Sequence, residues 1–176
     1  MHALKEYQNL IKAVDRRCRR ILSRQHEHIA CSRGCPGNCC RIHLSLYPVE
    51  AVSLALTLEK MVPHEQERIQ RKARQTNSFG PCPLLEDGAC LMYDARALIC
   101  RTHGLPMATE YRGQRSVGFC GKNFRNLSPI PEEDIIDLNR MNHLLAEANN
   151  RFIRDAVPGI SPGNRFTVAE ALLLNG

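Results

Sequence analysis

Apolar residues recur at three- and four-residue steps near the start of the chain. The stripe runs from Leu4 through Ile11 to Cys18, and most positions between its members are polar or charged. This spacing is typical of an amphipathic helix with one buried face. It predicts a long first helix over residues 4–28, with Cys18 turned toward the core.

Two prolines mark the starts of further helices. Pro48 opens the segment PVEAVSLALTLEKM, and Pro63 opens PHEQERIQRKARQ. Proline suits the first position of a helix because the backbone N–H that it lacks has no partner there anyway. We therefore expect helices over residues 48–61 and 63–75, arranged as a helical hairpin.

The C-terminal part of the chain predicts one long helix and one short one. After an acidic first turn, a stripe that includes Leu145 and Phe152 predicts a helix over residues 131–155, packed on the first helix. Farther on, Thr167 and Glu170 have the spacing of a capping box, which begins a short last helix.

The middle of the chain is punctuated by Gly, Pro and Cys. Within it, residues 105–119 predict a β-hairpin that turns at residues 112–114. The fold class that follows is mainly α, with a Cys-rich irregular metal-binding core and one small β-hairpin.

The length of 176 residues favours a single domain over residues 1–176. We expect the cysteine-cluster core to occupy residues 31–120. The flanking helices of residues 1–30 and 128–176 then pack on this core.

Composition points to metal as a source of stability. Aromatic residues make up only 5% of the sequence and Trp is absent, whereas Cys occurs nine times. The first ten residues lack the apolar run of a secretory leader, and no stretch approaches the roughly 18 apolar residues of a membrane span. We expect a soluble, cytoplasmic protein, in which disulfides are rare and thiolates bind metal, and which is partly unfolded without it.

Eight of the nine cysteines fall in two irregular clusters beside Gly and Pro. Loops of this kind can turn several sulfurs toward one point, as a tetrahedral metal site or an iron–sulfur cluster requires. Burial as small apolar residues or pairing in disulfides is the alternative, which four cysteines within ten residues disfavour. The predicted metal ligands are Cys31, Cys35, Cys39 and Cys40 in the first cluster, and Cys82, Cys90, Cys100 and Cys120 in the second.

The adjacent pair Cys39 and Cys40 bears on the kind of metal centre. Neighbouring side chains diverge, so the two thiols serve different metals, reach one polynuclear cluster, or include one spectator. No C-x-x-C pair occurs, which argues against thioredoxin-like chemistry and zinc-ribbon knuckles. An iron–sulfur cluster is slightly favoured over zinc, and the grouping of the thiols stays open.

The formal net charge of +6 treats every thiol as neutral. Eight thiolates around two divalent ions change the charge by about −8 + 4, which leaves roughly +2. Lys and Arg are also spread along predicted helices, as between Arg16 and Arg24. Nucleic acid is therefore disfavoured as a partner, metal ions are the expected ligands, and a protein partner stays open.

The cysteine motifs between residues 31 and 120 resemble those of a known family. The segments CSRGCPGNCC and GPCPLLEDGACLMYDARALICR, followed by Phe119-Cys120, are similar to the YkgJ-like cysteine-cluster family of zinc- or iron-chelating domains, of CxxCxxCC type. The opening spacing is longer than the shortest family form, and Ala97 stands where Pro is frequent. The resemblance implies metal or iron–sulfur binding by the eight clustered cysteines.

Polar residues beside the cysteines are candidates for supporting roles. Arg96, Arg101 and His103 can donate hydrogen bonds to ligand sulfurs or bind an anion beside the metal. The resemblance also leaves an iron–sulfur-dependent transferase or redox enzyme open, because a related domain occurs in flagellin lysine N-methylases. Such an enzyme predicts a pocket with Arg101 and His103. A zinc-stabilised nucleic-acid or protein adaptor instead predicts binding through residues 16–24.

Overall fold

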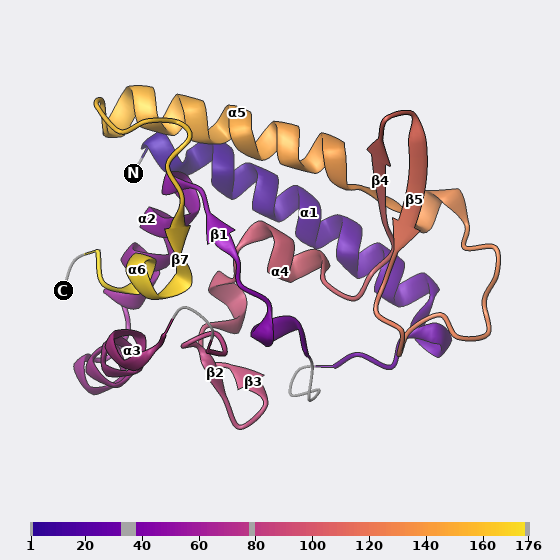
Figure 1. The fold of residues 1–176 in the computed structure, drawn as a ribbon, viewed down its shortest axis with the longest axis horizontal. Coiled ribbons are helices and arrows are strands. Elements are labelled where there is room, and N and C mark those ends of the chain that lie inside the picture. Colours follow the sequence, from indigo (N-terminus) through magenta and orange to yellow (C-terminus); the bar gives the residue numbers. More distant parts are fainter. Residues whose placement is uncertain (1, 33–37, 78–79, 175–176) are drawn as a thin grey trace.

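The long helices α1 (Lys5–Arg24) and α5 (Leu138–Ala156) lie side by side and run in opposite directions (Figure 1). The structure is a computed structural model that describes residues 2–32, 38–77 and 80–174. The apolar stripes of both helices enter one core, in which Cys18 is only 6% exposed, as predicted. Short 3₁₀ turns, η1 (His2–Leu4) and η2 (His26–His28), occupy the two ends of the expected first helix.

The helices that begin at proline are confirmed. They are α2 (Pro48–Leu58) and α3 (Pro63–Gln75), and each has its proline at the first helical position. The last helix, α6 (Val168–Leu172), packs against both and completes a second core. Its capping box is present: the Thr167 Oγ1 accepts from the Glu170 N–H at 3.1 Å, and the Glu170 carboxylate accepts from the Thr167 N–H at 2.7 Å.

The prediction of a helix over residues 131–155 was wrong at its start. The acidic residues form a 3₁₀ turn, η5 (Glu132–Asp134), and strand β6 (Ile136–Asp137) follows before α5 begins. Asp134 is 1% exposed and accepts a hydrogen bond of 2.5 Å from Gln25, so a contact with another part of the chain holds this turn. The Asp137 side chain then caps α5 by accepting from the Arg140 N–H at 2.9 Å.

The expected hairpin is confirmed as β4 (Met107–Tyr111) and β5 (Gln114–Gly118), which pair antiparallel across a turn at Arg112 and Gly113. It projects from the body of the molecule (Figure 1). Strand β6 pairs in parallel with the other edge of β4, so the sheet order is β5-β4-β6. The sequence pattern did not predict this long-range parallel pairing.

A second hairpin lies in the cysteine region and was not predicted. Strands β2 (Leu85–Glu86) and β3 (Ala89–Cys90) pair across a two-residue turn at Asp87 and Gly88, both with positive φ. Asp-Gly is a strong signal for such a turn, because Gly adopts this conformation without a steric penalty. A further short antiparallel pair joins β1 (Ser45–Leu46), just before α2, to β7 (Phe166–Thr167), just before α6.

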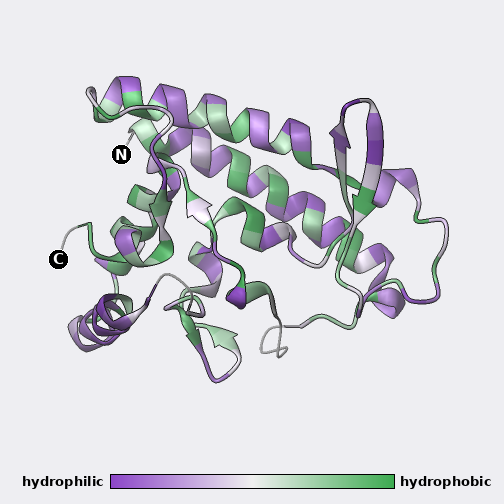
Figure 2. Ribbon diagram, viewed as in Figure 1, coloured by the Kyte–Doolittle hydropathy of each residue, from purple (hydrophilic) through white to green (hydrophobic). Residues whose placement is uncertain are grey.

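The fold is mainly α, and its apolar residues gather on the facing sides of the helices, whereas α3 is largely hydrophilic (Figure 2). The short helix α4 (Leu98–Thr102) packs on α1 and leads into the β4–β5 hairpin. No helix in the described part of the chain has both the length and the apolar character needed to cross a bilayer.

Candidate metal centre

A backbone hydrogen bond joins the two cysteine clusters of the sequence. Cys40 lies in the 3₁₀ turn η3 (Asn38–Arg41), and its carbonyl oxygen accepts from the Cys82 N–H at 2.8 Å. The Cys82 carbonyl accepts in turn from the Leu85 N–H at 2.9 Å, at the start of hairpin β2–β3. Cys90 stands directly opposite Leu85 in that hairpin. Cys40, Cys82 and Cys90 therefore belong to one local structure.

The thiols in this region interact with one another through their charges. Burial is the main cause that raises the pKa of Cys40 from 9.0 to about 11, and Cys39, Cys82 and Cys90 raise it further. Burial also raises the pKa of Cys100 to about 12, with Cys82 and Cys90 as the next causes. We call these five residues, Cys39, Cys40, Cys82, Cys90 and Cys100, the first thiol group.

Helix α4 carries Cys100 into the first thiol group, and a buried carboxylate holds the start of this helix. Glu50, only 5% exposed, accepts from the Leu98 N–H at 3.0 Å through Oε1 and from the Tyr47 N–H at 3.1 Å through Oε2. One carboxylate thus satisfies free amides at the starts of both α2 and α4. The position of Cys100 therefore depends on α2.

Two arginines brace the loop that precedes α4. The Arg96 guanidinium stacks on the Tyr93 ring at 3.5 Å and donates to the Cys100 carbonyl at 3.1 Å. Arg101 binds the Asp15 carboxylate with bonds of 2.9 and 3.0 Å, and also donates to the carbonyls of Arg96 and Asp94. Arg101 therefore ties backbone carbonyls of this loop to α1, whereas Arg96 joins the Tyr93 ring to the backbone of α4. His103, the third candidate, has an exposed side chain at the C-terminal end of α4.

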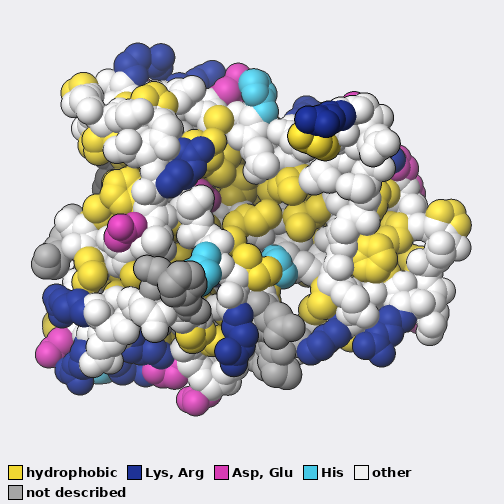
Figure 3. Space-filling view, viewed as in Figure 1, with side chains coloured by type: hydrophobic (Ala, Val, Ile, Leu, Met, Phe, Trp, Pro, Cys, Tyr) yellow, Lys and Arg dark blue, Asp and Glu magenta, His cyan; other side chains and the backbone are white. Residues whose placement is uncertain are grey.

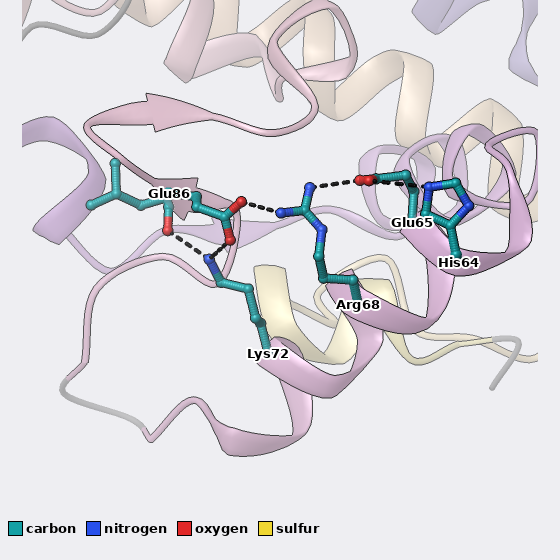
Figure 4. Close-up of polar contacts among 6 residues, drawn as sticks. His64, Glu65, Arg68, Lys72 and Glu86 are labelled. Atoms are coloured by element: carbon teal, nitrogen blue, oxygen red, sulfur yellow. Dashed lines mark hydrogen bonds and ion pairs between the residues drawn. The ribbon is translucent and has the colours of Figure 1, made fainter.

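An ion-pair network attaches hairpin β2–β3 to α3 (Figure 4). Lys72 donates to the Leu85 carbonyl at 3.0 Å and to the Glu86 carboxylate at 2.9 Å. Arg68 bridges Glu86 and Glu65, with a distance of 2.6 Å to the latter. The charge of Lys72 also opposes the rise in the pKa of Cys82, which burial chiefly causes. The helix thus holds the hairpin that carries Cys90 and that follows shortly after Cys82.

Cys31 and Cys120 come together at a different place. A Cβ atom on Gly104 would lie 3.5 Å from the Cys31 Sγ and 3.7 Å from the Cys120 Cβ, so both cysteines border this glycine. Gly104 has a φ of +95°, which L side chains rarely adopt. The positive φ is therefore what requires glycine here, since a Cβ would make only ordinary van der Waals contact with the two cysteines.

The buried amide of Asn123 ties the three segments of this second place together. Its Oδ1 accepts from the N–H groups of Ala30 and Cys31 at 2.9 and 3.0 Å, and its Nδ2 donates to the Gly104 carbonyl at 2.7 Å. Its own N–H donates to the Cys120 carbonyl at 2.8 Å. Asn123 is 1% exposed. A single Asn has no distinctive pattern in the sequence, so sequence analysis missed it.

The environment of Cys120 favours its thiolate. The Lys122 backbone N–H is the main cause that lowers the pKa of Cys120, and a hydrogen bond from the Cys31 side chain and the charge of Lys122 lower it further. Cys120 therefore differs from Cys40 and Cys100, whose pKa values are raised by burial.

Two further cysteines, Cys18 and Cys35, remain to be placed. Cys35 lies outside the described residues, and Cys18 lies in the core between α1 and its neighbours. Among residues 2–32, 38–77 and 80–174, no three His, Cys, Asp or Glu side chains are already arranged to hold a metal ion. The thiols of the first group are near one another, but they do not have the geometry of a closed site.

Two hollows lie on the described surface, and two arginines of α1 make contacts within the chain. A hollow of about 420 Å³ lies between the N-terminus of α1 and the C-terminus of α5, and another of about 200 Å³ adjoins η2. Neither is lined by Arg101 or His103. On α1, Arg17 donates to the Ile135 carbonyl and Arg24 pairs with Glu133. Figure 3 shows Lys and Arg side chains at several separate places on the visible face.

Comparison with known proteins yields one match. A family model named CxxCxxCC and described as "Putative zinc- or iron-chelating domain" matches residues 30–121, just over half of the chain. The matched segment runs from the residue before Cys31 to the residue after Cys120, so it includes both thiol-bearing places. No curated protein and no solved structure matches the chain.

Proposed function

This chain belongs to the CxxCxxCC family of zinc- or iron-chelating domains, and we propose that its first thiol group holds an iron–sulfur cluster. Zinc in the same place is the alternative. The observation that carries the proposal is the backbone hydrogen bond from Cys82 to Cys40, which brings thiol-bearing segments of both sequence clusters together.

The donor chemistry fits such a centre. The first thiol group offers five sulfur donors, and iron–sulfur clusters are held by cysteine thiolates. The adjacent residues Cys39 and Cys40 favour a polynuclear cluster over a mononuclear zinc ion, because neighbouring side chains diverge and reach one small ion with difficulty. When bound, a cluster supplies electron transfer or Lewis-acid chemistry. The chain contributes thiolates and the hydrogen bonds that orient them.

Metal binding and folding are coupled in this proposal. The raised pKa values of Cys40 and Cys100 mean that both thiols hold protons in the metal-free chain, and a metal must displace these protons. The thiols also have to close around the metal, since no ligand geometry is preformed among the described residues. Metal thereby stabilises the loops around η3 and β2–β3. We infer that the protein works in a reducing compartment, because thiolates remain available there.

The test is the metal and sulfide content of anaerobically purified protein, together with its ultraviolet–visible spectrum. Cys40→Ser and Cys100→Ser each remove a thiol of the first group, whereas Cys18→Ala removes a thiol of the core and serves as the matched control. We expect brown wild-type protein with iron and sulfide, loss of both in the first two variants, and retention in the control.

Two results contradict this expectation in different ways. Colourless protein without sulfide, whose zinc is lost in Cys40→Ser and Cys100→Ser, overturns the iron–sulfur centre and establishes the zinc alternative. Protein without metal, or metal that is unaffected by Cys40→Ser and Cys100→Ser, overturns metal binding by the first thiol group.

A further inference from the structure

Helix α1 turns one face away from the helices that pack on it. Its apolar side contacts α4 and α5 and buries Tyr7, Cys18 and Ile21. On the opposite side, five basic side chains are exposed, and we call them the basic stripe: Lys5, Lys12, Arg16, Arg19 and Arg20. At 3.6 residues per turn and 1.5 Å per residue, the basic stripe occupies about 100° of arc around the helix axis and a length of about 22 Å.

The acidic residues of α1 lie beside the basic stripe and are neutralised there by other elements. Glu6 pairs with Arg151 of α5 at 3.1 Å, and Asp15 pairs with Arg101 of α4 at 2.9 Å. Within residues 2–32, 38–77 and 80–174, no ion pair joins a carboxylate to any side chain of the basic stripe. The stripe is therefore a surface of one sign whose charge the chain itself leaves unbalanced.

The fold sorts the cations of α1 into two kinds. Arg17 donates to the Ile135 carbonyl at 3.2 Å, and Arg24 pairs with Glu133 at 2.6 Å, so both are engaged within the chain. The cations of the basic stripe share the remaining face. The spread of Lys and Arg along the sequence, which disfavoured nucleic acid, conceals this arrangement because it does not show which side chains the fold engages.

We propose that the basic stripe binds double-stranded DNA through its phosphates, without reading the base sequence. Charge complementarity carries this inference, because a duplex presents one negative charge per about 1.7 Å of its axis and so matches the whole length of the stripe. Three of the five cations are arginines, whose planar guanidinium groups bind phosphate oxygens with two parallel hydrogen bonds.

The rest of the exposed face favours duplex DNA over other anionic partners. Protein interfaces need an apolar centre and membrane-bound helices insert an apolar face, whereas the exposed apolar residues Ala13 and Leu22 only flank the stripe on opposite sides. Single strands stack on aromatic side chains, and the aromatic residue of α1, Tyr7, is buried. The major groove of B-DNA is about 12 Å wide and admits a helix, whereas that of duplex RNA is narrow.

The salt dependence of DNA binding tests the proposal. Fluorescence anisotropy of a short labelled duplex of random sequence measures the affinity of anaerobically purified protein between about 50 and 200 mM KCl. We expect the logarithm of the affinity to fall linearly with the logarithm of the salt concentration, with a slope between about −4 and −5. Arg16→Gln/Arg20→Gln should lower the affinity by about 10- to 100-fold and reduce the size of the slope by about two.

A control variant removes the same two charges elsewhere. Arg71 and Arg74 are exposed on α3, which packs in the second core, and Gln suits a helix as well as Arg does. Arg71→Gln/Arg74→Gln should change the affinity by less than about twofold, because charges far from the bound duplex are screened. The single variant Lys12→Gln gives a third measurement and should reduce the size of the slope by about one.

The outcomes separate this inference from the proposed function, on which it does not rest. Absence of DNA binding at about 50 mM KCl, or equal losses in the two double variants, overturns the inference. Tighter binding of duplex RNA or of polyglutamate than of DNA overturns DNA as the partner. Metal content is measured on the same preparations and should be equal in all of them, so a metal-free wild type overturns the proposed function without bearing on the basic stripe.

Discussion

The backbone N–H of Cys82 donates a hydrogen bond of 2.8 Å to the carbonyl oxygen of Cys40. This bond connects a cysteine of the first sequence cluster with one of the second, and hairpin β2–β3 continues directly from it. The thiols that share the first group are therefore selected by a tertiary contact and not by their spacing along the chain. Residues that hold the two partners in place should affect metal binding without touching metal.

Lys72 is one such residue, and we expect Lys72→Met to lower metal affinity of the first group by about 10-fold. The ammonium group holds the Leu85 carbonyl and the Glu86 carboxylate, so its loss leaves Arg68 to attach the hairpin to α3 through Glu86 and weakens that attachment. Arg71→Met is the control, because Arg71 lies on the same helix and pairs with the exposed Glu67 at 3.3 Å. Chelator competition measures both, and equal affinities would show that α3 does not position the hairpin.

Gly104→Ala should disturb the place where Asn123 joins the segments of Cys31, Gly104 and Cys120. An alanine at a φ of +95° costs about 1–3 kcal/mol, and its Cβ would lie 3.3 Å from the Asn123 Nδ2. Gly121→Ala is the control, since no atom lies within 4 Å of a Cβ at that position. Urea denaturation should show a loss of unfolding free energy in the first variant alone. A similar loss in both would refute the requirement for glycine at residue 104.

Metal affinity of the first thiol group should keep rising with pH beyond the ordinary thiol pKa of 9.0. Metal competes with protons, and the pKa values of Cys40 and Cys100 are raised to about 11 and about 12, chiefly by burial. The same shifts make the metal-free folded chain less stable as pH rises from 9.0 toward those values, because the unfolded chain releases its protons first. Chelator competition across this range tests the expectation, and an affinity that levels off below the ordinary thiol pKa contradicts it.

Arg101→Lys should destabilise the protein by about 2 kcal/mol, because a lysine cannot make the four hydrogen bonds to Asp15, Arg96 and Asp94 at once. The Arg101 side chain is only 9% exposed, and the Arg96 carbonyl that would lose its donor is partly buried. Arg112→Lys, on the exposed turn of hairpin β4–β5, is the control. Chemical denaturation of the metal-loaded protein compares them, and equal midpoints would argue against a bracing role for Arg101.

Local sequence signals predicted most of the helices because the causes are local. The stripe through Cys18 predicted α1, and Thr167 with Glu170 marked the start of α6, since both rest on contacts within a few residues. The start of α5 was mispredicted because the preceding turn is held from afar, by the bond from Gln25 to Asp134 and by the pairing of β6 with β4. The helix propensity of residues within the segment does not reveal those distant partners.

The sequence by itself determined the chemistry of the protein: clustered cysteines on loops, in the order that its family shares. Only the tertiary structure decided which thiols meet, placing Cys40 beside Cys82 and Cys31 beside Cys120. The physical reason is that the ability of a thiol to bind metal comes from its own sulfur atom, whereas the position of its neighbours depends on long-range hydrogen bonds such as those of buried Asn123. Such bonds exist only once the chain has folded.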